Sequence, residues 1–245
     1  MTRRRVNNPL ALAVLSCLQE RPMHPYQISS TLRQRGKEQS IRLNFGSLYA
    51  VVTSLEKHGL ITQRERIRSG NRPERTVYEI TEAGVTEFED WLAELLRTPT
   101  ADPSPLESAL SLIAGLPPDE AAELLEERTT RLDLEARRIG ADLEWSREQG
   151  LPEVFLIEAV FREAMVRAER DFVMRLAADI RSEALGGTSA WRRVHELRAE
   201  GVPMDEILGR AGELLGPDAR ILEPGHGPYE PPHRPQEPGT DPSGA

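Results

Sequence analysis

The sequence predicts a mainly α-helical protein: an N-terminal winged helix-turn-helix with a two-stranded wing, followed by a long-helix dimerisation domain. Two observations predict this fold class. Three helical patterns, a basic hairpin and a fourth helical pattern lie within residues 9–97, and two much longer helical patterns follow. Residues 1–80 hold 14 Lys and Arg against 6 Asp and Glu, whereas residues 81–245 hold 17 against 34. A basic head on an acidic body indicates that the head binds a polyanion.

The first helix is predicted over residues 9–20, because Asn8 supplies a cap and Pro9 suits the first turn. Its apolar residues recur at helical spacing, so we expect a core helix in which Cys17 is a small buried side chain. Three arginines before this run also mimic a signal peptide with a lipid-attachment cysteine. The run is short, however, and Glu20 follows it at once without a cleavage site. No other run approaches membrane-spanning length and the single cysteine excludes an internal disulfide, so we expect a cytoplasmic protein.

Two further helices complete the predicted helix-turn-helix. One covers residues 25–35, and the next lies between Asn44 as its N-cap and Gly59 as its left-handed stop. At 100° per residue, one face of this helix collects large apolar side chains, namely Phe45, Leu48, Val52 and Leu55. The opposite face holds small side chains and one lysine: Gly46, Ala50, Thr53, Ser54 and Lys57, with Ser47 and Tyr49 on its flanks.

A basic hairpin is predicted next, because residues 61–68 and 75–80 flank a segment with the turn residues Gly70, Asn71 and Pro73. Strand alternation places Arg64, Arg66 and Arg68 on one side of the first strand, and Ile61 and Ile67 on the other. Arg72 and Arg75 supply a basic tip. Thr81 then caps a helix to about Arg97 with the apolar stripe Phe88, Trp91, Leu92 and Leu95.

The rest of the chain is predicted to be helical and then disordered. We assign residues 1–97 to the winged helix-turn-helix DNA-binding domain, 98–105 to a linker, 106–185 to a helical dimerisation domain, 186–216 to additional short helices (189–200 and 204–215), and 217–245 to a disordered tail. The tail contains eight Pro and four Gly and almost nothing to bury. His226 and His233 lie there without ligand spacing, so we expect no metal site.

The dimerisation domain is predicted to contain helices over residues 106–115, 118–149 and 153–185. Apolar residues recur along the two long helices, at Leu125, Leu132, Ala136, Ile139 and Leu143 in one, and at Phe161, Met165, Ala168, Phe172, Leu176 and Ile180 in the other. Two such helices bury little against each other, so we expect a partner chain to cover the remaining apolar surface. A monomeric helical hairpin folded on the N-terminal domain is the alternative.

The small-residue face of the third helix is typical of a recognition helix. Such a helix enters the DNA major groove, where small side chains let the backbone approach base edges and hydroxyls donate or accept hydrogen bonds. Lys57 and the hairpin arginines are placed for phosphates or an adjacent minor groove. An exposed helix with small solvated residues is the alternative interpretation.

Three segments also resemble the PadR family of bacterial transcriptional regulators: ERPMHPYQI, NFGSLYAVVTSLEKHGLI and ERTVYEITEAG, all within residues 10–97. The resemblance is weaker over residues 104–185 and does not cover residues 186–245. It implies a dimeric winged-helix protein, in most members a repressor that a small molecule releases from DNA. It also implies DNA-facing roles for Tyr26, Ser47 and Tyr49 and a wing tip at Arg72 and Arg75. Pro25 stands where the family usually has Gly, and His24 is interpreted as a helix-entry residue with a sensor role as the alternative.

We therefore predict a homodimeric DNA-binding transcriptional regulator, a repressor of palindromic operators on double-stranded DNA. The candidate DNA-contacting residues are Tyr26, Asn44, Gly46, Ser47, Tyr49, Ala50, Thr53, Lys57, Arg64, Arg66, Arg72 and Arg75. A winged helix that docks another protein through its basic wing is the alternative function. An enzyme is not expected, because no nucleophile–base arrangement, metal-ligand spacing or phosphate loop occurs, and no cofactor is implied.

A small aromatic effector is expected between the dimer arms and the winged-helix domains, as the resemblance implies. Trp91, Trp145 and Phe161 are the candidates to line that space. Core or dimer packing is the alternative role for each of the three side chains.

Overall fold

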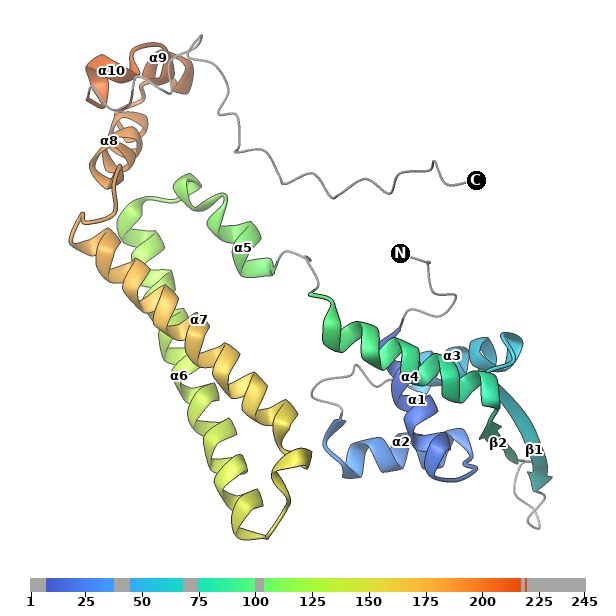
Figure 1. Cartoon of the computed structure of the whole chain (residues 1–245). Coiled ribbons are helices and arrows are strands. Elements are labelled where there is room, and N and C mark those ends of the chain that lie inside the picture. Colours follow the sequence, from blue (N-terminus) through green and yellow to red (C-terminus); the bar gives the residue numbers. More distant parts are fainter. Residues whose placement is uncertain (1–7, 38–44, 68–74, 100–103, 217–218, 220–245) are drawn as a thin grey trace, which may run out of the picture. The chain divides into compact units, whose positions relative to one another are not determined.

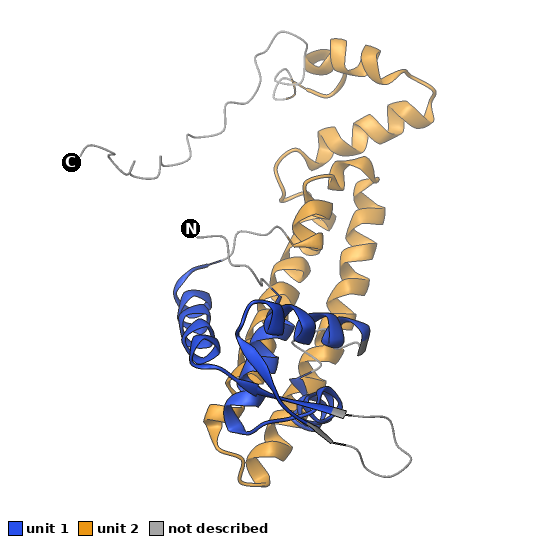
Figure 2. Ribbon diagram, turned by 90° about the vertical axis from the view of Figure 1, so that its right-hand side faces the viewer, with its two compact units in different colours: residues 1–102 blue, residues 103–245 orange. Residues whose placement is uncertain are grey.

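The structure, a computed structural model, describes residues 8–37, 45–67, 75–99, 104–216 and 219. The side chains of residues 45, 66, 67 and 75 lie outside the described part. The chain divides into two compact units, residues 1–102 and 103–245, which Figure 2 colours blue and orange. No helix in the described ranges is both long enough and apolar enough to cross a membrane.

Unit 1 has the predicted order of helix, helix, helix, hairpin and helix (Figure 1). Its elements are α1 (Pro9–Glu20), α2 (Pro25–Gln34), α3 (Phe45–Lys57), β1 (Ile61–Ile67), β2 (Arg75–Ile80) and α4 (Glu82–Arg97). The predicted fold class, a winged helix followed by long helices, is confirmed.

Helix α1 forms the centre of this unit. Asn8 caps it by accepting a hydrogen bond from the Leu10 amide at 2.9 Å, and both Val14 and Leu15 are completely buried. The prediction of a core helix is therefore confirmed. Cys17 is buried as well, and desolvation raises the pKa of its thiol to about 11, so at neutral pH it remains a protonated, small apolar side chain.

Helix α4 meets the end of α3 at a tight junction. The Thr81 hydroxyl accepts from the Gly84 amide at 3.1 Å and donates to the Gly59 carbonyl at 2.7 Å. Gly84 is buried, and a Cβ atom added to it would lie 2.1 Å from the backbone oxygen of Leu60. Only glycine therefore allows the two segments to come this close.

Gly84→Ala is expected to destabilise unit 1 by a net of about 2 kcal/mol, because overpacking costs up to about 3 kcal/mol and better helix propensity returns about 1. Urea denaturation followed by circular dichroism measures the change. Gly209→Ala is the matched control, since a Cβ there meets open space in helix α9 (Met204–Gly209). Equal stability of the two variants would show that the junction relaxes at no cost.

Two sequence predictions in unit 1 need correction. Of the predicted stripe on α4, Trp91 is buried and Phe88 half-buried, but Leu92 and Leu95 are exposed in this single chain. The predicted strand alternation is also wrong beyond Gln63. Gln63 pairs with Tyr78 and Glu65 with Val77, so Arg64 is an extra residue in a β-bulge and shifts the alternation by one residue.

In its described part, residues 104–216 and 219, unit 2 contains helices and no strand (Figure 1). They are α5 (Pro105–Leu110), η2 (Ile113–Gly115), α6 (Pro118–Glu148), η3 (Glu153–Phe155), α7 (Ile157–Arg181), α8 (Thr188–Ala199), α9 (Met204–Gly209) and α10 (Ala211–Leu214). Three predicted helices are shorter or divided. The helix predicted over 106–115 becomes α5 and η2, and that over 204–215 divides at Arg210. The helix predicted over 153–185 starts as a 3₁₀ turn and ends before Glu183, whose positive φ of 57° terminates the helix.

Helices α6 and α7 lie side by side as an antiparallel pair (Figure 1). The predicted stripe on α6 is confirmed: Leu125, Ala136, Ile139 and Leu143 are buried and Leu132 is half-buried. On α7, the buried residues are Val173, Ala177 and Ile180. Val173, Ala177 and Ile180 thus form the α7 side of the contact with α6.

The predicted stripe on α7 is confirmed only at its C-terminal end, where Ile180 is buried and Leu176 half-buried in the cluster with α6. The other four residues of the stripe are exposed, which corrects the prediction for them. Phe161, Met165 and Phe172 are 65%, 54% and 47% exposed, and Ala168 is exposed as well. At 100° per residue, these four side chains lie roughly 110° around the helix from Val173. We refer to Phe161, Met165, Ala168 and Phe172 as the α7 seam.

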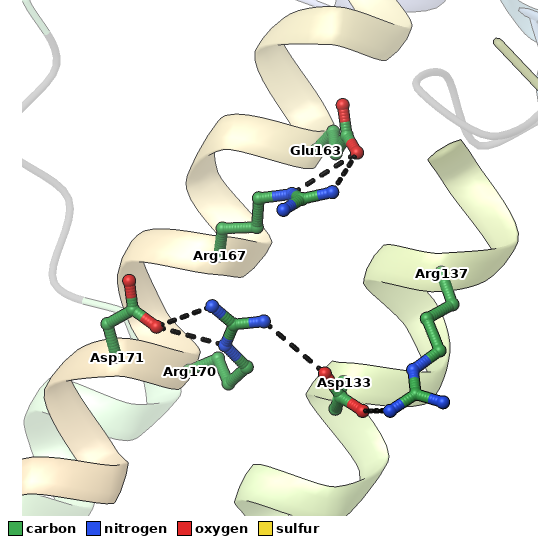
Figure 3. Close-up of polar contacts among 6 residues, drawn as sticks. All are labelled: Asp133, Arg137, Glu163, Arg167, Arg170 and Asp171. Atoms are coloured by element: carbon green, nitrogen blue, oxygen red, sulfur yellow. Dashed lines mark hydrogen bonds and ion pairs between the residues drawn. The ribbon is translucent and has the colours of Figure 1, made fainter. Parts of the chain in front are cut away.

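The other flank of α7 is polar, as Figure 3 shows. Arg170 bonds Asp171 at 2.7 Å and reaches Asp133 of α6 at 3.3 Å, while Arg167 bonds Glu163 at 2.7 Å. Partly exposed ion pairs such as these contribute little stability individually, but they satisfy the charges on this flank. The α7 seam, by contrast, consists of apolar side chains.

Candidate nucleic-acid interface

Helix α3 presents two chemically opposite faces. Leu48, Val52 and Leu55 are buried in the core of unit 1, as predicted, together with Val51. The exposed side, which we call the outer face of α3, consists of Gly46, Ala50, Thr53 and Lys57. Ser54, which was predicted on this face, is half-buried, and so is Ser47 on the flank. The outer face is therefore a strip of three small residues that ends in one positive charge.

The end of α3 is fixed by local hydrogen bonds. Gly59 has a φ of 71° and the Leu60 amide donates to the Leu55 carbonyl at 3.0 Å, which are two features of a Schellman stop. The His58 ring contacts the Ser54 carbonyl at 2.7 Å. Lys57 is consequently held at the last turn of a rigid helix, and Leu60 returns the chain to the core.

Two exposed tyrosines lie on the helix-turn-helix, Tyr26 in the first turn of α2 and Tyr49 on α3. His24 caps α2: its ring Nδ1 accepts from the Tyr26 amide at 3.0 Å, and Gln27 closes a reciprocal capping box. His24 is thus a helix-entry residue, as predicted. Asn44 lies outside the described residues.

The wing is an antiparallel pair of β1 and β2, and backbone hydrogen bonds of 3.0 Å between Met23 and Tyr78 attach it to the helices. Arg64, the bulge residue, lies 3.5 Å from the Glu79 carboxylate, and both side chains are exposed. The sequence alone did not predict this pair, although a register with Ile61 opposite Ile80 makes Arg64 and Glu79 diagonal neighbours. Arg66 and Arg75 belong to the strands, but their side chains, like all of Arg72, lie outside the described part.

The three candidate effector residues lie in different surroundings. Trp91 is buried among the core residues of unit 1. Trp145 and Phe161 belong to α6 and α7 of unit 2, where both are well exposed. Among the described residues, no three His, Cys, Asp or Glu side chains are arranged to hold a metal ion.

Comparisons with known proteins agree with this architecture. The sequence model of the family described as "Transcriptional regulator PadR-like family" matches residues 14–90. Bacillus subtilis PadR in complex with operator DNA has a similar fold, with a TM-score of 0.55 and 19% identity over 70% of this chain and 99% of that one. The same protein in complex with p-coumaric acid gives a TM-score of 0.53 and 16% identity over 71% and 97%. No curated protein sequence matches the chain.

Proposed function

We propose that this protein is a homodimeric repressor of palindromic operators, released from DNA by a small molecule. The match of residues 14–90 to the PadR-like family of transcriptional regulators supports this proposal. The observation that carries the proposal is the outer face of helix α3, where exposed small side chains end at Lys57 while the opposite face is buried in the core. Bacillus subtilis PadR, which has a similar fold, has been solved with operator DNA and with p-coumaric acid. These two complexes support the proposals that this protein binds DNA and that it binds a small-molecule effector.

The outer face of α3 suits insertion into a major groove. Gly46, Ala50 and Thr53 add little width to the helix, so its backbone can approach base edges within a groove about 12 Å wide. The Thr53 hydroxyl can donate to or accept from a base, and the Ala50 methyl suits a thymine methyl. The phosphates on either side of the groove would be bound by Lys57, Tyr26, Tyr49 and the wing arginines.

Dimerisation is proposed through the α7 seam. This strip is apolar and exposed, and it lies on the flank of α7 opposite the ion pairs of Figure 3. A second copy would cover Phe161, Met165 and Phe172 and remove their surface from water. Two recognition helices would then meet half-sites one turn apart, with a centre-to-centre spacing of about 34–36 Å.

The proposal is tested by selecting the bound sequence from random duplexes and measuring the affinity at several salt concentrations. Palindromic half-sites about one turn apart are expected, and affinity should fall about 10³-fold between 50 and 200 mM salt if six phosphates are contacted. A single half-site without a repeat would contradict the dimer. Absence of any salt-dependent binding would favour a protein-interaction module.

Glu79→Gln is expected to tighten operator binding about threefold to tenfold at low salt. The carboxylate lies 3.5 Å from Arg64, so it partly neutralises the one wing arginine whose side chain is described, and it repels phosphate. The exposed pair contributes little to stability, so the fold should be unaffected. Fluorescence anisotropy with labelled operator measures the change, and Glu89→Gln on α4 is the control for net charge. If the two variants bind the operator with equal affinity, Arg64 and Glu79 of the wing do not contribute to DNA binding.

A further inference from the structure

Unit 2 contains a pocket of about 530 Å³ between α5, the η2 turn and the first half of α6. Leucines of α5, of the residues flanking η2 and of α6 line it, including Leu106, Leu116 and Leu124, and no aromatic ring is among the lining residues. Its volume lies within the range of small-molecule sites, which are mainly apolar with a few polar groups. Leu112 at the edge of the pocket is 76% exposed, so apolar surface there is in contact with water. An apolar ligand in the pocket would bury that surface.

Charged side chains lie at one side of the pocket. Arg128 bonds Glu169 of α7 at 2.5 Å and thereby links the two long helices. Arg131 bonds Glu127, one turn away on α6, at 3.0 Å, in a pair whose side chains are 79% and 55% exposed. Exposed pairs of this kind are weak. A ligand carboxylate can therefore replace Glu127 on the Arg131 guanidinium at small cost.

The wall of the pocket is held in place from outside by α8. The Trp191 indole N–H donates to the Leu116 carbonyl at 2.7 Å, and His195 Nε2 lies 2.9 Å from the Ala114 carbonyl. Arg192 also pairs with Asp119 in the first turn of α6. Because η2 and the start of α6 are fixed to α8 in this way, the pocket is largely preformed and a ligand does not have to organise it.

We propose that this pocket binds a small aliphatic carboxylic acid, whose alkyl chain fills the leucine-lined space and whose carboxylate pairs with Arg131. The absence of lining aromatic rings favours a flexible alkyl chain, and the exposed arginine selects the acid over the corresponding alcohol. The role of this pocket as the effector site rests on the proposed function. Binding of the acid to the pocket does not depend on that function, and it is measured without DNA.

Isothermal titration calorimetry of the full-length protein with hexanoate, octanoate and decanoate tests the proposal. Affinity is expected to rise about fourfold per added methylene until the pocket is full, and 1-octanol should bind at least about tenfold more weakly than octanoate. Arg131→Gln should weaken octanoate binding about tenfold. Arg137→Gln should leave it unchanged, because Arg137, which is as exposed as Arg131, forms an i,i+4 pair with Asp133 outside the pocket. Filling the space with Ala109→Trp should abolish binding, whereas Ala141→Trp, at an exposed site on α6 outside the pocket, should not.

The proposal is overturned if octanoate does not bind, or if Arg131→Gln and Arg137→Gln bind it equally. It is also overturned if the Arg131 and Ala109 variants change the mass of the assembly in light scattering, since the pocket would then be a contact between subunits. If Ala109→Trp fails to fold, the comparison of Arg131→Gln with Arg137→Gln tests the proposal alone. Operator binding by the same samples reports on the proposed function separately.

Discussion

Ala50→Glu is expected to weaken operator binding at least about 100-fold while leaving the fold intact. Ala50 lies in the middle of the outer face of α3 and is exposed in the free protein, so a longer side chain there meets only solvent. Against DNA, the same side chain would hold the helix away from the base edges and bring a carboxylate toward phosphates. Like-charge juxtaposition costs several kcal/mol, and about 2.7 kcal/mol already corresponds to a 100-fold loss.

The matched control for this substitution is Ala93→Glu, at an exposed alanine on α4. Both variants change the net charge by the same amount in a helical, solvated position of unit 1. Anisotropy titrations with labelled operator measure the affinity, and thermal unfolding followed by circular dichroism checks that both variants are folded. If the two variants bind DNA with the same affinity, α3 is not the recognition helix and the proposed docking mode is wrong.

The outer face of α3 was predictable because all of its determinants are local. The helical period separates Leu48 and Leu55 from Ala50 and Thr53, and Gly59 marks the end of the helix whatever the rest of the chain does. The wing illustrates the opposite case. A bulge at Arg64 depends on how two strands pair, and a single-residue shift is enough to invalidate an alternation read from one strand.

Helix α7 shows a second limit of sequence reasoning. It carries two apolar strips, and periodicity cannot tell which of them packs against the neighbouring helix. The large side chains Phe161 and Phe172 dominate the predicted strip, yet they are exposed. The contact with α6 is formed by Val173 and Ala177 together with Ile180, the last residue of the predicted strip. Small residues permit close helix approach, so the more hydrophobic strip is the one left for another partner.

Met165→Glu is accordingly expected to convert the proposed homodimer into a folded monomer, raising the dimer dissociation constant at least about 100-fold. Met165 lies in the centre of the α7 seam, and a second copy covering that seam would bury the new carboxylate without a partner. An uncompensated buried charge costs several kcal/mol after relaxation. In the isolated chain the side chain is 54% exposed, so the fold of unit 2 does not depend on it.

Met174→Glu is the control, because Met174 is 49% exposed on the same helix but lies on the opposite flank, half a turn from Met165. Sedimentation equilibrium across a range of protein concentrations measures the mass of both variants. The monomer should also bind a palindromic operator about 10²- to 10⁴-fold more weakly, because two linked half-site contacts become independent ones. It should keep the affinity of the parent protein for an isolated half-site. A Met165→Glu protein that remains dimeric would place the subunit contact elsewhere on unit 2 and leave the α7 seam without a role in assembly.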